Sequence, residues 1–460
     1  MTPVDQLDAH RLGMILDELA ESLSPGALVR DPGVIEGYRF DRARTIQPGT
    51  PIALVRAADR DDVQALMRFA TAHRIGVVTR GAGTGLSGGS TAVDGTITLS
   101  TERLRRLDVD AAALTATVGP GLINAEVKAA AREAGLWYPP DPSSFEICSI
   151  GGNLATNAGG LCCVKYGVTT DYVLAVDVVL ADGRAVTLGG RTVKDVAGLD
   201  LKRLFIGSEG VLGVITEATL RLRPPPPPAS TVVATFADVT DACRAVVAIM
   251  ERVRPSALEL MDSAAVAAVE AVRPMGLESV GAILIGQTDA GPAEAGLMES
   301  ACECHGATFV ASTDDTDEGE MMMGARRMAI PCVERLGAVL IEDVGVPIPR
   351  IPELIAGVAR IAAERDTLVP VIGHAGDGNF HPLVTYDASD PGAAARAATA
   401  FDEIMSLALD LGGTVTGEHG IGTLKSRHLA DQLGDDVMEL TRRIKGALDP
   451  LGILNPGKWV

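Results

Sequence analysis

The stretch that decides the fold is TRGAGTGLSGGS, residues Thr79–Ser90, which holds five glycines in nine residues after Arg80. Gly83, Gly85 and Gly88 match the GxGxxG fingerprint of dinucleotide-binding folds, but that fingerprint requires a helix directly after the glycines. Here turn-forming residues follow, and then the run Thr96-Ile97-Thr98-Leu99, which predicts a strand. We therefore expect a bare backbone loop between two strands instead of a Rossmann turn. Its successive N–H groups, with Arg80 at its start, would form a nest for a pyrophosphate.

Two further stretches of small residues follow in the same half of the chain. The first is PPDPSS at Pro139–Ser144, followed by SIGGNLATNAGG at Ser149–Gly160, and the second is GSEGVLG at Gly207–Gly213. The 51 glycines among 460 residues exceed the usual share of about 7%. Three glycine-rich clusters in one domain predict an extended cofactor that lies along exposed backbone.

The composition excludes several classes of protein. Hydrophobic residues make up 47% of the chain and charged residues 22%, which excludes a disordered protein. The net charge of −20 repels phosphate backbones and anionic lipid, so we expect no nucleic-acid partner and a local cationic pocket for any anionic substrate.

The cysteines and the apolar runs bear on the compartment. The seven cysteines include no CxxC pair, which argues against a disulfide framework, a zinc ribbon or an iron–sulfur cluster and favours reduced thiols. The start, MTPVDQLDAHRL, has no apolar signal region, and no apolar run reaches the length of a membrane span. The sequence thus predicts a cytoplasmic protein without a transmembrane segment.

The proline run Arg223–Pro228 predicts a semi-rigid linker between two domains. Before it, apolar spacing predicts a helix over 61–73, a strand over 76–79, and a hairpin of 173–180 with 185–188 around Asp182-Gly183. After it, the pattern predicts strands at 231–236, 257–260 and 280–285 with a helix over 239–252, an α+β arrangement. The acidic segment STDDTDEGE, 312–320, predicts an exposed loop.

Three of the seven histidines lie in two turn-like motifs near the C-terminus, GHAGDGNFHP at 373–382 and GEHGIG at 417–422. If the flanks of the first motif pair as a hairpin, its two imidazoles lie close together. Two histidines and one carboxylate can hold zinc, manganese or iron(II) with positions open for substrate. Hydrogen-bonded turn histidines are the plainer alternative. A non-haem iron oxygenase is another, but it gives no role to the glycine loops.

Taken together, these motifs resemble one known family. The matching stretches are RGAGTGLSGG (80–89), IGGNLATNAGG (150–160), IGSEGVLGVIT (206–216), the two histidine motifs and NPGK (455–458). They are similar to the FAD-linked subunit of glycolate oxidase and to D-lactate and D-2-hydroxyglutarate dehydrogenases, which are vanillyl-alcohol oxidase-type flavoproteins. The motifs occur in the family's order from about residue 35 onward.

The resemblance implies an α+β fold in three parts. Residues 1–223 would form a two-subdomain FAD-binding domain, and residues 224–410 a substrate-binding cap domain on a largely antiparallel sheet. Residues 411–460 would return to the FAD domain and the active site. The FAD would be bound non-covalently, because the loop carries no histidine where some relatives attach it.

The resemblance also implies the residues of the site. FAD contacts would come from Arg80, Gly81, Ala82, Gly83, Thr84, Gly85, Ser87, Gly88, Pro140, Asp141, Ser144, Ile150, Gly151, Gly152, Ala155, Thr156, Asn157, Gly159, Gly160, Glu209, Gly213, Ile215 and Asn455. The metal ligands would be His374, His381 and Glu418, with zinc as the expected divalent ion and manganese or iron as alternatives. The general base would be His419, and the arginine for the substrate carboxylate would be Arg326, with Arg327 as the alternative.

The expected activity is oxidation of a D-2-hydroxy acid to the 2-oxo acid by hydride transfer to flavin. Relatives that act on longer diacids carry a lysine shortly after the arginine, and LIEDVGVP, Leu340–Pro347, has none. This favours D-lactate or glycolate over 2-hydroxyglutarate.

Other functions stay open. The chain could be the FAD subunit of a multi-subunit glycolate oxidase that is active only with iron–sulfur partners, or a flavoprotein of non-redox group transfer. The electron acceptor could be a quinone, a cytochrome, an electron-transfer flavoprotein, an iron–sulfur subunit or oxygen. A homodimer is compatible with the sequence.

Overall fold

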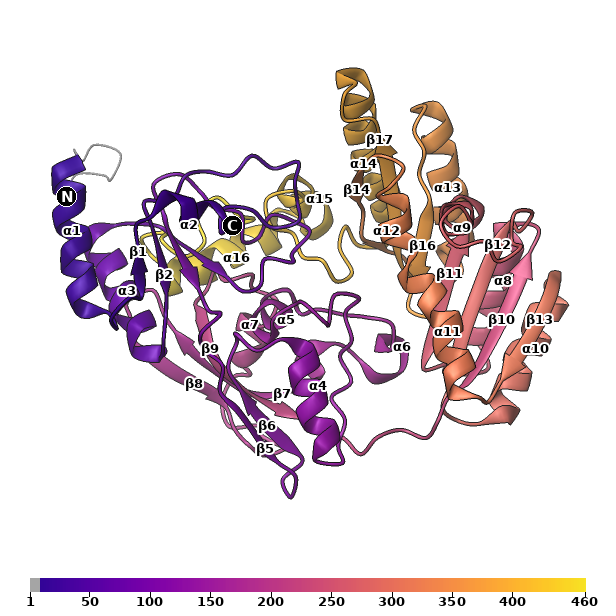
Figure 1. Cartoon of the computed structure of the whole chain (residues 1–460), viewed down its shortest axis with the longest axis horizontal. Helices are drawn as coiled ribbons and strands as arrows, with labels where there is room; N and C mark the ends of the chain where they lie inside the picture. Colours follow the sequence, from indigo (N-terminus) through magenta and orange to yellow (C-terminus); the bar gives the residue numbers. More distant parts are fainter. Residues whose placement is uncertain (1–8) are drawn as a thin grey trace. The chain divides into compact units, whose positions relative to one another are not determined.

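The computed structural model describes residues 9–460, which fold into two compact units that alternate along the chain (Figure 1). Of the described residues, unit 1 comprises 9–158, 168–225 and 418–460, and unit 2 comprises 159–167 and 226–417. Proline-rich residues 224–229 carry no helix or strand and are largely exposed, as expected of consecutive prolines that lack N–H donors.

Unit 1 contains a four-stranded and a five-stranded sheet. The first has the order β1-β2-β4-β3, and the second has the order β5-β6-β9-β7-β8 with all pairs antiparallel. The strands are β1 (Leu28–Val29), β2 (Ala53–Arg56), β3 (Val77–Arg80), β4 (Ile97–Ser100), β5 (Leu107–Asp110), β6 (Thr115–Val118), β7 (Val173–Val179), β8 (Ala185–Gly189) and β9 (Val214–Arg221). The helices are α1 (Ala9–Ser22), α2 (Pro32–Glu36), α3 (Arg60–His73), α4 (Asn124–Glu133), α5 (Ile150–Thr156), α7 (Lys202–Phe205), α15 (Leu429–Leu433) and α16 (Asp435–Leu448).

The predicted glycine loop lies between two parallel neighbours. Strands β3 and β4 pair in parallel, with Val77 opposite Ile97, yet residues 81–96 connect them without a helix. A parallel pair normally requires a helical crossover. The prediction that the GxGxxG stretch does not begin a helix is therefore confirmed, and the loop begins at the carboxyl end of β3.

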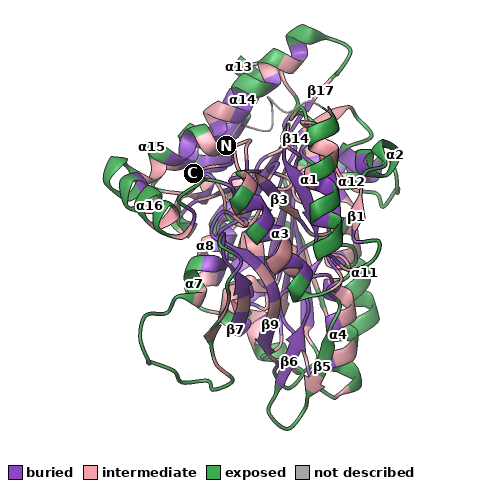
Figure 2. Cartoon of the chain, turned by 90° about the vertical axis from the view of Figure 1, so that its left-hand side faces the viewer, coloured by how far each residue is buried: buried purple, intermediate pink, exposed green. Residues whose placement is uncertain are grey.

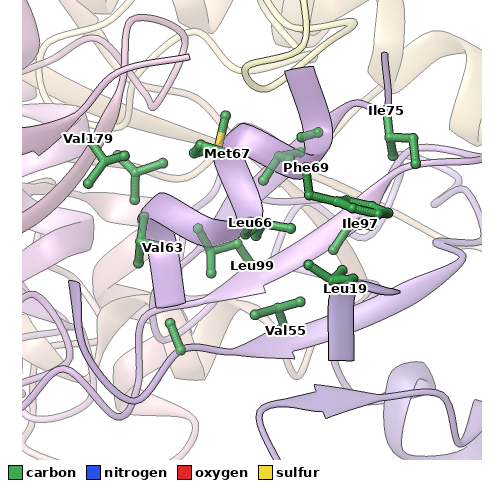
Figure 3. Packing of buried hydrophobic residues seen from close by; sticks show 14 of the residues in the cluster. Leu19, Val55, Val63, Leu66, Met67, Phe69, Ile75, Ile97, Leu99 and Val179 are labelled. Carbon is green, nitrogen blue, oxygen red and sulfur yellow. The ribbon is translucent and has the colours of Figure 1, made fainter. Parts of the chain in front are cut away.

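Unit 1 has two apolar cores, one for each sheet. In the first, Leu66 and Met67 of α3 pack with Ile97 and Leu99 of β4, and all four side chains are completely buried (Figure 3). The predicted amphipathic helix at 61–73 and the hairpin of β7 and β8 are confirmed. Residues 191–201, between β8 and α7, are exposed throughout (Figure 2).

Unit 2 is built on an eight-stranded sheet with only antiparallel pairs, ordered β13-β10-β12-β11-β16-β17-β14, with β15 beside β17. Its strands are β10 (Ser230–Phe236), β11 (Ala257–Asp262), β12 (Ala282–Thr288), β13 (Ala307–Thr313), β14 (Ala338–Ile341), β15 (Val344–Gly345), β16 (Val371–His374) and β17 (Asn379–Tyr386). Its helices are α6 (Cys163–Tyr166), α8 (Val239–Met250), α9 (Ser263–Glu270), α10 (Pro292–Cys304), α11 (Thr316–Arg327), α12 (Ala329–Val333), α13 (Ile351–Glu364) and α14 (Pro391–Asp410). All but one residue of β10 are buried, so helices cover both faces of the sheet there.

The loop predicted for residues 312–320 is wrong. Residues Thr316–Glu320 form the first turns of α11, and the Asp315 carboxylate caps them by accepting hydrogen bonds from the N–H groups of Asp317 and Glu318. Acidic residues in a first turn complement the positive end of the helix dipole. The acidic run thus begins a helix, and the first turn has no apolar stripe that would have predicted it.

Within residues 9–460, no helix combines the length and the apolar character that crossing a bilayer requires. All seven cysteines are free thiols, and four of them are buried.

Candidate active site and cofactor loops

The loop after β3 contains a run of backbone N–H groups that are available as hydrogen-bond donors. Gly83 and Gly88 have φ angles of +73° and +80°, a region that side chains disfavour. In the part of the chain that the structure describes, the N–H groups of residues 83–89 donate no hydrogen bond. Such a run of N–H groups attracts phosphate oxygens, so the loop fits the pyrophosphate of a dinucleotide.

Arg80 supports this loop from behind. Its side chain is buried, and its Nη1 donates to the carbonyl oxygen of Phe40. A Cβ atom placed on Gly83 would lie 2.0 Å from Nη2 of Arg80, so this guanidinium is packed against the loop backbone. Burial lowers the pKa of Arg80, although nearby acids such as Asp41 oppose the shift. The sequence predicts Arg80 as an FAD contact, and in the structure its guanidinium packs against the loop backbone.

Ser149 joins the first two glycine-rich segments. Its Oγ atom caps α5 by accepting from the N–H of Gly152 at 3.2 Å, and it accepts from the N–H of Ala82 at the same distance. Gly81 must be small because a Cβ there would lie 2.3 Å from that Oγ. Ser149 is not among the predicted FAD contacts, although a serine directly before a helix start is a typical N-cap signal.

The third glycine-rich segment packs on α5 as well. The N–H groups of Gly207 and Glu209 donate to the carbonyl oxygens of Leu154 and Ala155 at 2.9 and 2.8 Å. Predicted residues Ile150, Gly151, Gly152, Ala155 and Thr156 lie in α5, and Asn157 ends the helix at φ +52°. Unit 1 therefore brings the three segments together.

Glu209 ties the GEHGIG motif to this cluster. Its carboxylate accepts hydrogen bonds from the N–H groups of Ile421 and Gly422, both at 2.7 Å. Burial raises the pKa of Glu209 to about 7, because the two amide donors and Lys458 only partly offset the loss of solvation. Asn455, also predicted as an FAD contact, donates from Nδ2 to the carbonyl oxygens of Gly89 and Glu209.

The remaining predicted FAD residues have mixed surroundings. Pro140, Asp141 and Ser144 precede α5, where Asn124 donates to the Pro140 carbonyl oxygen at 3.3 Å. Gly213 and Ile215 lie at β9, and a Cβ on Gly213 would lie 2.5 Å from Val178 Cγ1, so strand packing explains that glycine. The last two, Gly159 and Gly160, belong to unit 2.

In unit 2, strands β16 and β17 form the predicted hairpin, with His374 opposite Asn379 and Ile372 opposite His381. This register puts the two imidazoles on one face as diagonal neighbours. Their ring centroids lie 5.2 Å apart with the planes at 84°, and both side chains are buried.

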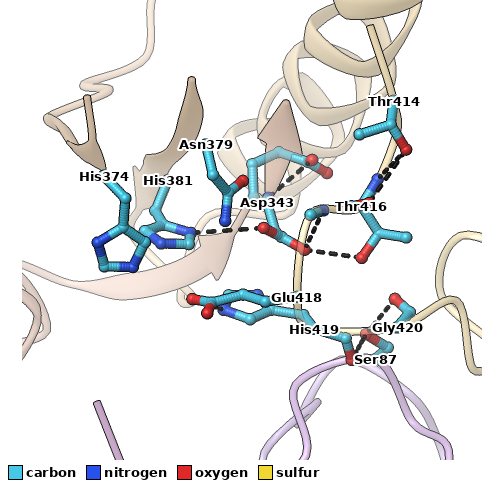
Figure 4. A network of polar contacts seen from close by, with 12 residues as sticks. Ser87, Asp343, His374, Asn379, His381, Thr414, Thr416, Glu418, His419 and Gly420 are labelled. Carbon is cyan, nitrogen blue, oxygen red and sulfur yellow. Dashed lines mark hydrogen bonds and ion pairs between the residues drawn. The ribbon is translucent and has the colours of Figure 1, made fainter. Parts of the chain in front are cut away.

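Each histidine has a carboxylate at its Nδ1 atom. The Oε1 atom of Glu259 lies 2.7 Å from Nδ1 of His374, and Oδ1 of Asp343 lies 3.8 Å from Nδ1 of His381. Asp343 also accepts from the Thr416 hydroxyl and the Gly417 N–H through Oδ2 (Figure 4). A carboxylate hydrogen-bonded at Nδ1, as Glu259 is at His374, directs metal coordination to Nε2, which is the usual environment of metal-binding histidines; Asp343 lies at ion-pair distance from His381. The two imidazoles on one face therefore fit a divalent metal.

Arg326 lies in the same unit at the end of α11. Only 4% of its side chain is exposed, and its Nε atom lies 3.0 Å from Oε2 of Glu259. Its Nη2 atom is buried and has no hydrogen-bond partner among the described residues. Burial alone would raise the pKa of Glu259, but the interactions with His374 and Arg326 outweigh it and hold that pKa below the ordinary value.

The remaining predicted residues, Glu418 and His419, begin the last segment of unit 1. The Oε1 atom of Glu418 lies 3.7 Å from Nε2 of His419. The Ser87 hydroxyl lies within hydrogen-bond distance of the carbonyl oxygens of His419 and Gly420, at 3.0 and 2.8 Å (Figure 4). A Cβ on Gly422 would lie 2.1 Å from the Ser87 carbonyl oxygen. The base motif is thus held against the glycine loop of β3.

Two family models match the chain. The FAD binding domain model matches residues 51–189, which include the loop after β3 and α5, and the model of the C-terminal domain of FAD linked oxidases matches residues 225–459.

Curated relatives match nearly the whole chain. Glycolate oxidase subunit GlcD of Bacillus subtilis is 38% identical over 92% of this chain and 91% of its own length. The subunit of the same name from Escherichia coli K12 is 38% identical over 89% of this chain and 83% of its own. D-lactate dehydrogenase of Archaeoglobus fulgidus is 35% identical over 92% and 96%.

Solved structures of the vanillyl-alcohol oxidase type share the fold. Para-cresol methylhydroxylase with bound substrate aligns with a TM-score of 0.82 at 16% identity, covering 99% of this chain and 98% of that chain. The 4-ethylphenol oxidase of Gulosibacter chungangensis aligns with a TM-score of 0.80 at 19% identity, covering 100% and 98%. The predicted α+β fold and flavoprotein class are confirmed, and the chain belongs to the FAD-linked oxidases as an FAD-dependent oxidoreductase.

Proposed function

We propose that this enzyme oxidises a D-2-hydroxy acid, with D-lactate or glycolate preferred, to the corresponding 2-oxo acid. The observation that carries the proposal is the buried group of Arg326, His374 and His381 in unit 2, with Glu259 between the arginine and the first histidine. Relatives named glycolate oxidase subunit and D-lactate dehydrogenase point to the same substrate class.

Arg326 would hold the substrate carboxylate. Its buried Nη2 donor needs an acceptor, and a carboxylate oxygen supplies one with a charge-assisted hydrogen bond. This cation provides the local positive charge that a chain of net charge −20 requires for an anionic substrate.

The same region disfavours a second substrate carboxylate. Glu342 and Asp343 follow β14 and are fully buried in unit 2, and no lysine lies in the segment 340–347. Two buried acids would repel the distal carboxylate of 2-hydroxyglutarate. A short monocarboxylate avoids this repulsion.

His374, His381 and Glu418 would hold a divalent metal, with zinc expected, through two imidazoles and one carboxylate. When bound, that ion supplies charge stabilisation for the alkoxide that develops on the substrate. His419 would take the hydroxyl proton as general base. Unit 1 would hold non-covalent FAD on the amides of residues 83–89, and the flavin supplies the hydride acceptor.

The names of the relatives leave two alternatives for the natural electron acceptor. A glycolate oxidase subunit passes electrons within an assembly, which would require an iron–sulfur partner, whereas a dehydrogenase acting as a single chain would reduce a quinone, a cytochrome or an electron-transfer flavoprotein. Turnover of the purified chain with a dye acceptor distinguishes the two, because the assembly-dependent form would stay inactive.

A stopped-flow screen of flavin reduction tests the substrate. We expect bleaching of the oxidised flavin with D-lactate or glycolate and much slower reduction with L-lactate or D-2-hydroxyglutarate. Chelation should slow the reduction, and added zinc should restore it. Fast reduction by D-2-hydroxyglutarate would contradict the preference, and full activity after verified metal removal would contradict the ligand assignment.

A further inference from the structure

Glu259 is a completely buried carboxylate with two different partners. Its Oε1 atom lies 2.7 Å from Nδ1 of His374, and its Oε2 atom lies 3.0 Å from Nε of Arg326. The exposed fraction is 0% for Glu259 and 4% for each partner side chain. One carboxylate therefore spans the proposed metal ligand and the proposed substrate arginine.

The fold fixes both contacts. Glu259 in β11 lies directly opposite His374 in β16, so the antiparallel register alone brings their side chains together. Arg326 reaches the second oxygen from the end of α11. The arginine, the acid and the histidine thus come from three elements that are far apart in the sequence.

The chemistry of these contacts defines a role. A carboxylate at Nδ1 keeps the proton on that atom, which leaves the lone pair of the neutral imidazole on Nε2. The same carboxylate forms an ion pair with a buried guanidinium, with Oε2 at 3.0 Å from Nε. The Nη2 atom has no hydrogen-bond partner among the described residues, so it can bind another acceptor.

We propose that Glu259 is a positioning residue that sets the tautomer of His374 for metal binding and holds Arg326 for the substrate carboxylate. This inference rests on the proposed function of His374 and Arg326. It links metal affinity to substrate affinity through a single side chain that does not itself touch the reacting atoms.

The matched variants are Glu259→Gln and Glu270→Gln. Glu270 is also a buried carboxylate of unit 2, but it accepts hydrogen bonds from the N–H groups of Met275 and Gly276 at the end of α9. The control therefore removes a buried charge without touching the histidines. Glu259→Asp keeps the charge but shortens the reach, and we expect intermediate values from it.

We expect Glu259→Gln to weaken zinc binding about 10- to 100-fold in a competition with a chromophoric chelator. The KM for D-lactate or glycolate should rise as well, while Glu270→Gln leaves both values within about two-fold of wild type. Retained flavin absorbance and a native circular dichroism spectrum show that each variant folds. Unchanged zinc affinity and KM in folded Glu259→Gln would overturn the proposal.

A second measurement uses the wild-type protein and no metal. In the metal-free protein labelled with ¹⁵N-histidine, we expect His374, assigned by comparison with His374→Gln, to carry its proton on Nδ1. A proton on Nε2 alone would overturn the role of Glu259, whatever the variants do. Failure of wild-type protein to bind zinc would instead contradict the proposed metal site, while the tautomer would still decide the role of Glu259.

Discussion

Arg326 and Arg327 are adjacent in the chain but have opposite surroundings. Arg326 is buried against Glu259, whereas the Arg327 side chain is 44% exposed and pairs with Glu320, which is 56% exposed. This contrast supports Arg326 as the substrate arginine. The neighbouring residue then offers a natural control.

We expect Arg326→Lys to raise the KM for the hydroxy acid about 10- to 100-fold, because an ammonium cannot reproduce the guanidinium fork and a hydrogen bond to a charged group contributes about 1.5–3 kcal/mol. Arg327→Lys should change KM by less than two-fold. Steady-state kinetics with a dye acceptor measures both. Equal effects in the two variants, or none in Arg326→Lys, would exclude this assignment.

For His419→Ala we expect turnover to fall by roughly two to four orders of magnitude, the usual contribution of a general base. Its carbonyl oxygen, not its ring, contacts Ser87, so the variant should keep the bound-flavin spectrum. Pre-steady-state flavin reduction provides the rate. A variant that reduces its flavin as fast as wild type would remove His419 from the proton transfer.

At this scale the sequence was informative only where residues are close together along the chain. His374 and His381 stood out because one glycine-rich turn separates them. Glu259 did not, because it lies 115 residues from His374 and only strand register brings the two together. Asp343 did not stand out either, since nothing local in the sequence marks it as a partner of His381.

Among the elements, the loop after β3 depends most clearly on glycine. Gly83 at φ +73° and Gly135 at φ +72° have the same backbone conformation, so an alanine would strain the backbone equally at either position. A Cβ atom at Gly135, however, meets nothing within 4 Å. We expect Gly83→Ala to weaken FAD binding by at least ten-fold, because the methyl group would also displace Arg80 and the loop amides. Gly135→Ala should leave it unchanged. Titration of apoprotein with FAD, followed by flavin fluorescence, tests this, and equal affinities would show that the loop does not bind the cofactor.

Elements with an apolar period were predictable, and elements that begin with charge were not. The helix at α3 and the hairpin of β7 and β8 followed from spacing and from Asp182-Gly183. The start of α11 was missed because Asp315, Asp317 and Glu318 stabilise a helix end electrostatically and leave no apolar stripe.

For the whole molecule, Glu209 predicts a pH dependence of stability. Its pKa is about 7 in the folded protein and about 4.5 ordinarily, so the folded state binds the proton more tightly between these values. Stability should therefore fall as the pH rises from about 5 to 7, by an amount on the order of 3 kcal/mol, since one pKa unit corresponds to about 1.4 kcal/mol. Above pH 7 this contribution should level off.

Thermal unfolding of wild type and Glu209→Gln across this pH range measures the effect. The melting temperature of wild type should fall relative to that of Glu209→Gln as the pH rises to 7. Lys458, whose pKa burial lowers to about 8, titrates above this window and does not interfere. A difference that stays constant across the range would show that Glu209 does not titrate there.

The arrangement of unit 1 also dictates an order of events during synthesis. The backbone of Val77 in β3 makes two hydrogen bonds to late residues: its N–H donates to the carbonyl oxygen of Ile453, and its carbonyl oxygen accepts from the N–H of Asn455. Those partners leave the ribosome only after all of unit 2 has been translated. The outer edge of β3, the strand that leads into the glycine loop, therefore stays without its partner on a nascent chain, and we expect stable binding of FAD only after residue 455 has emerged.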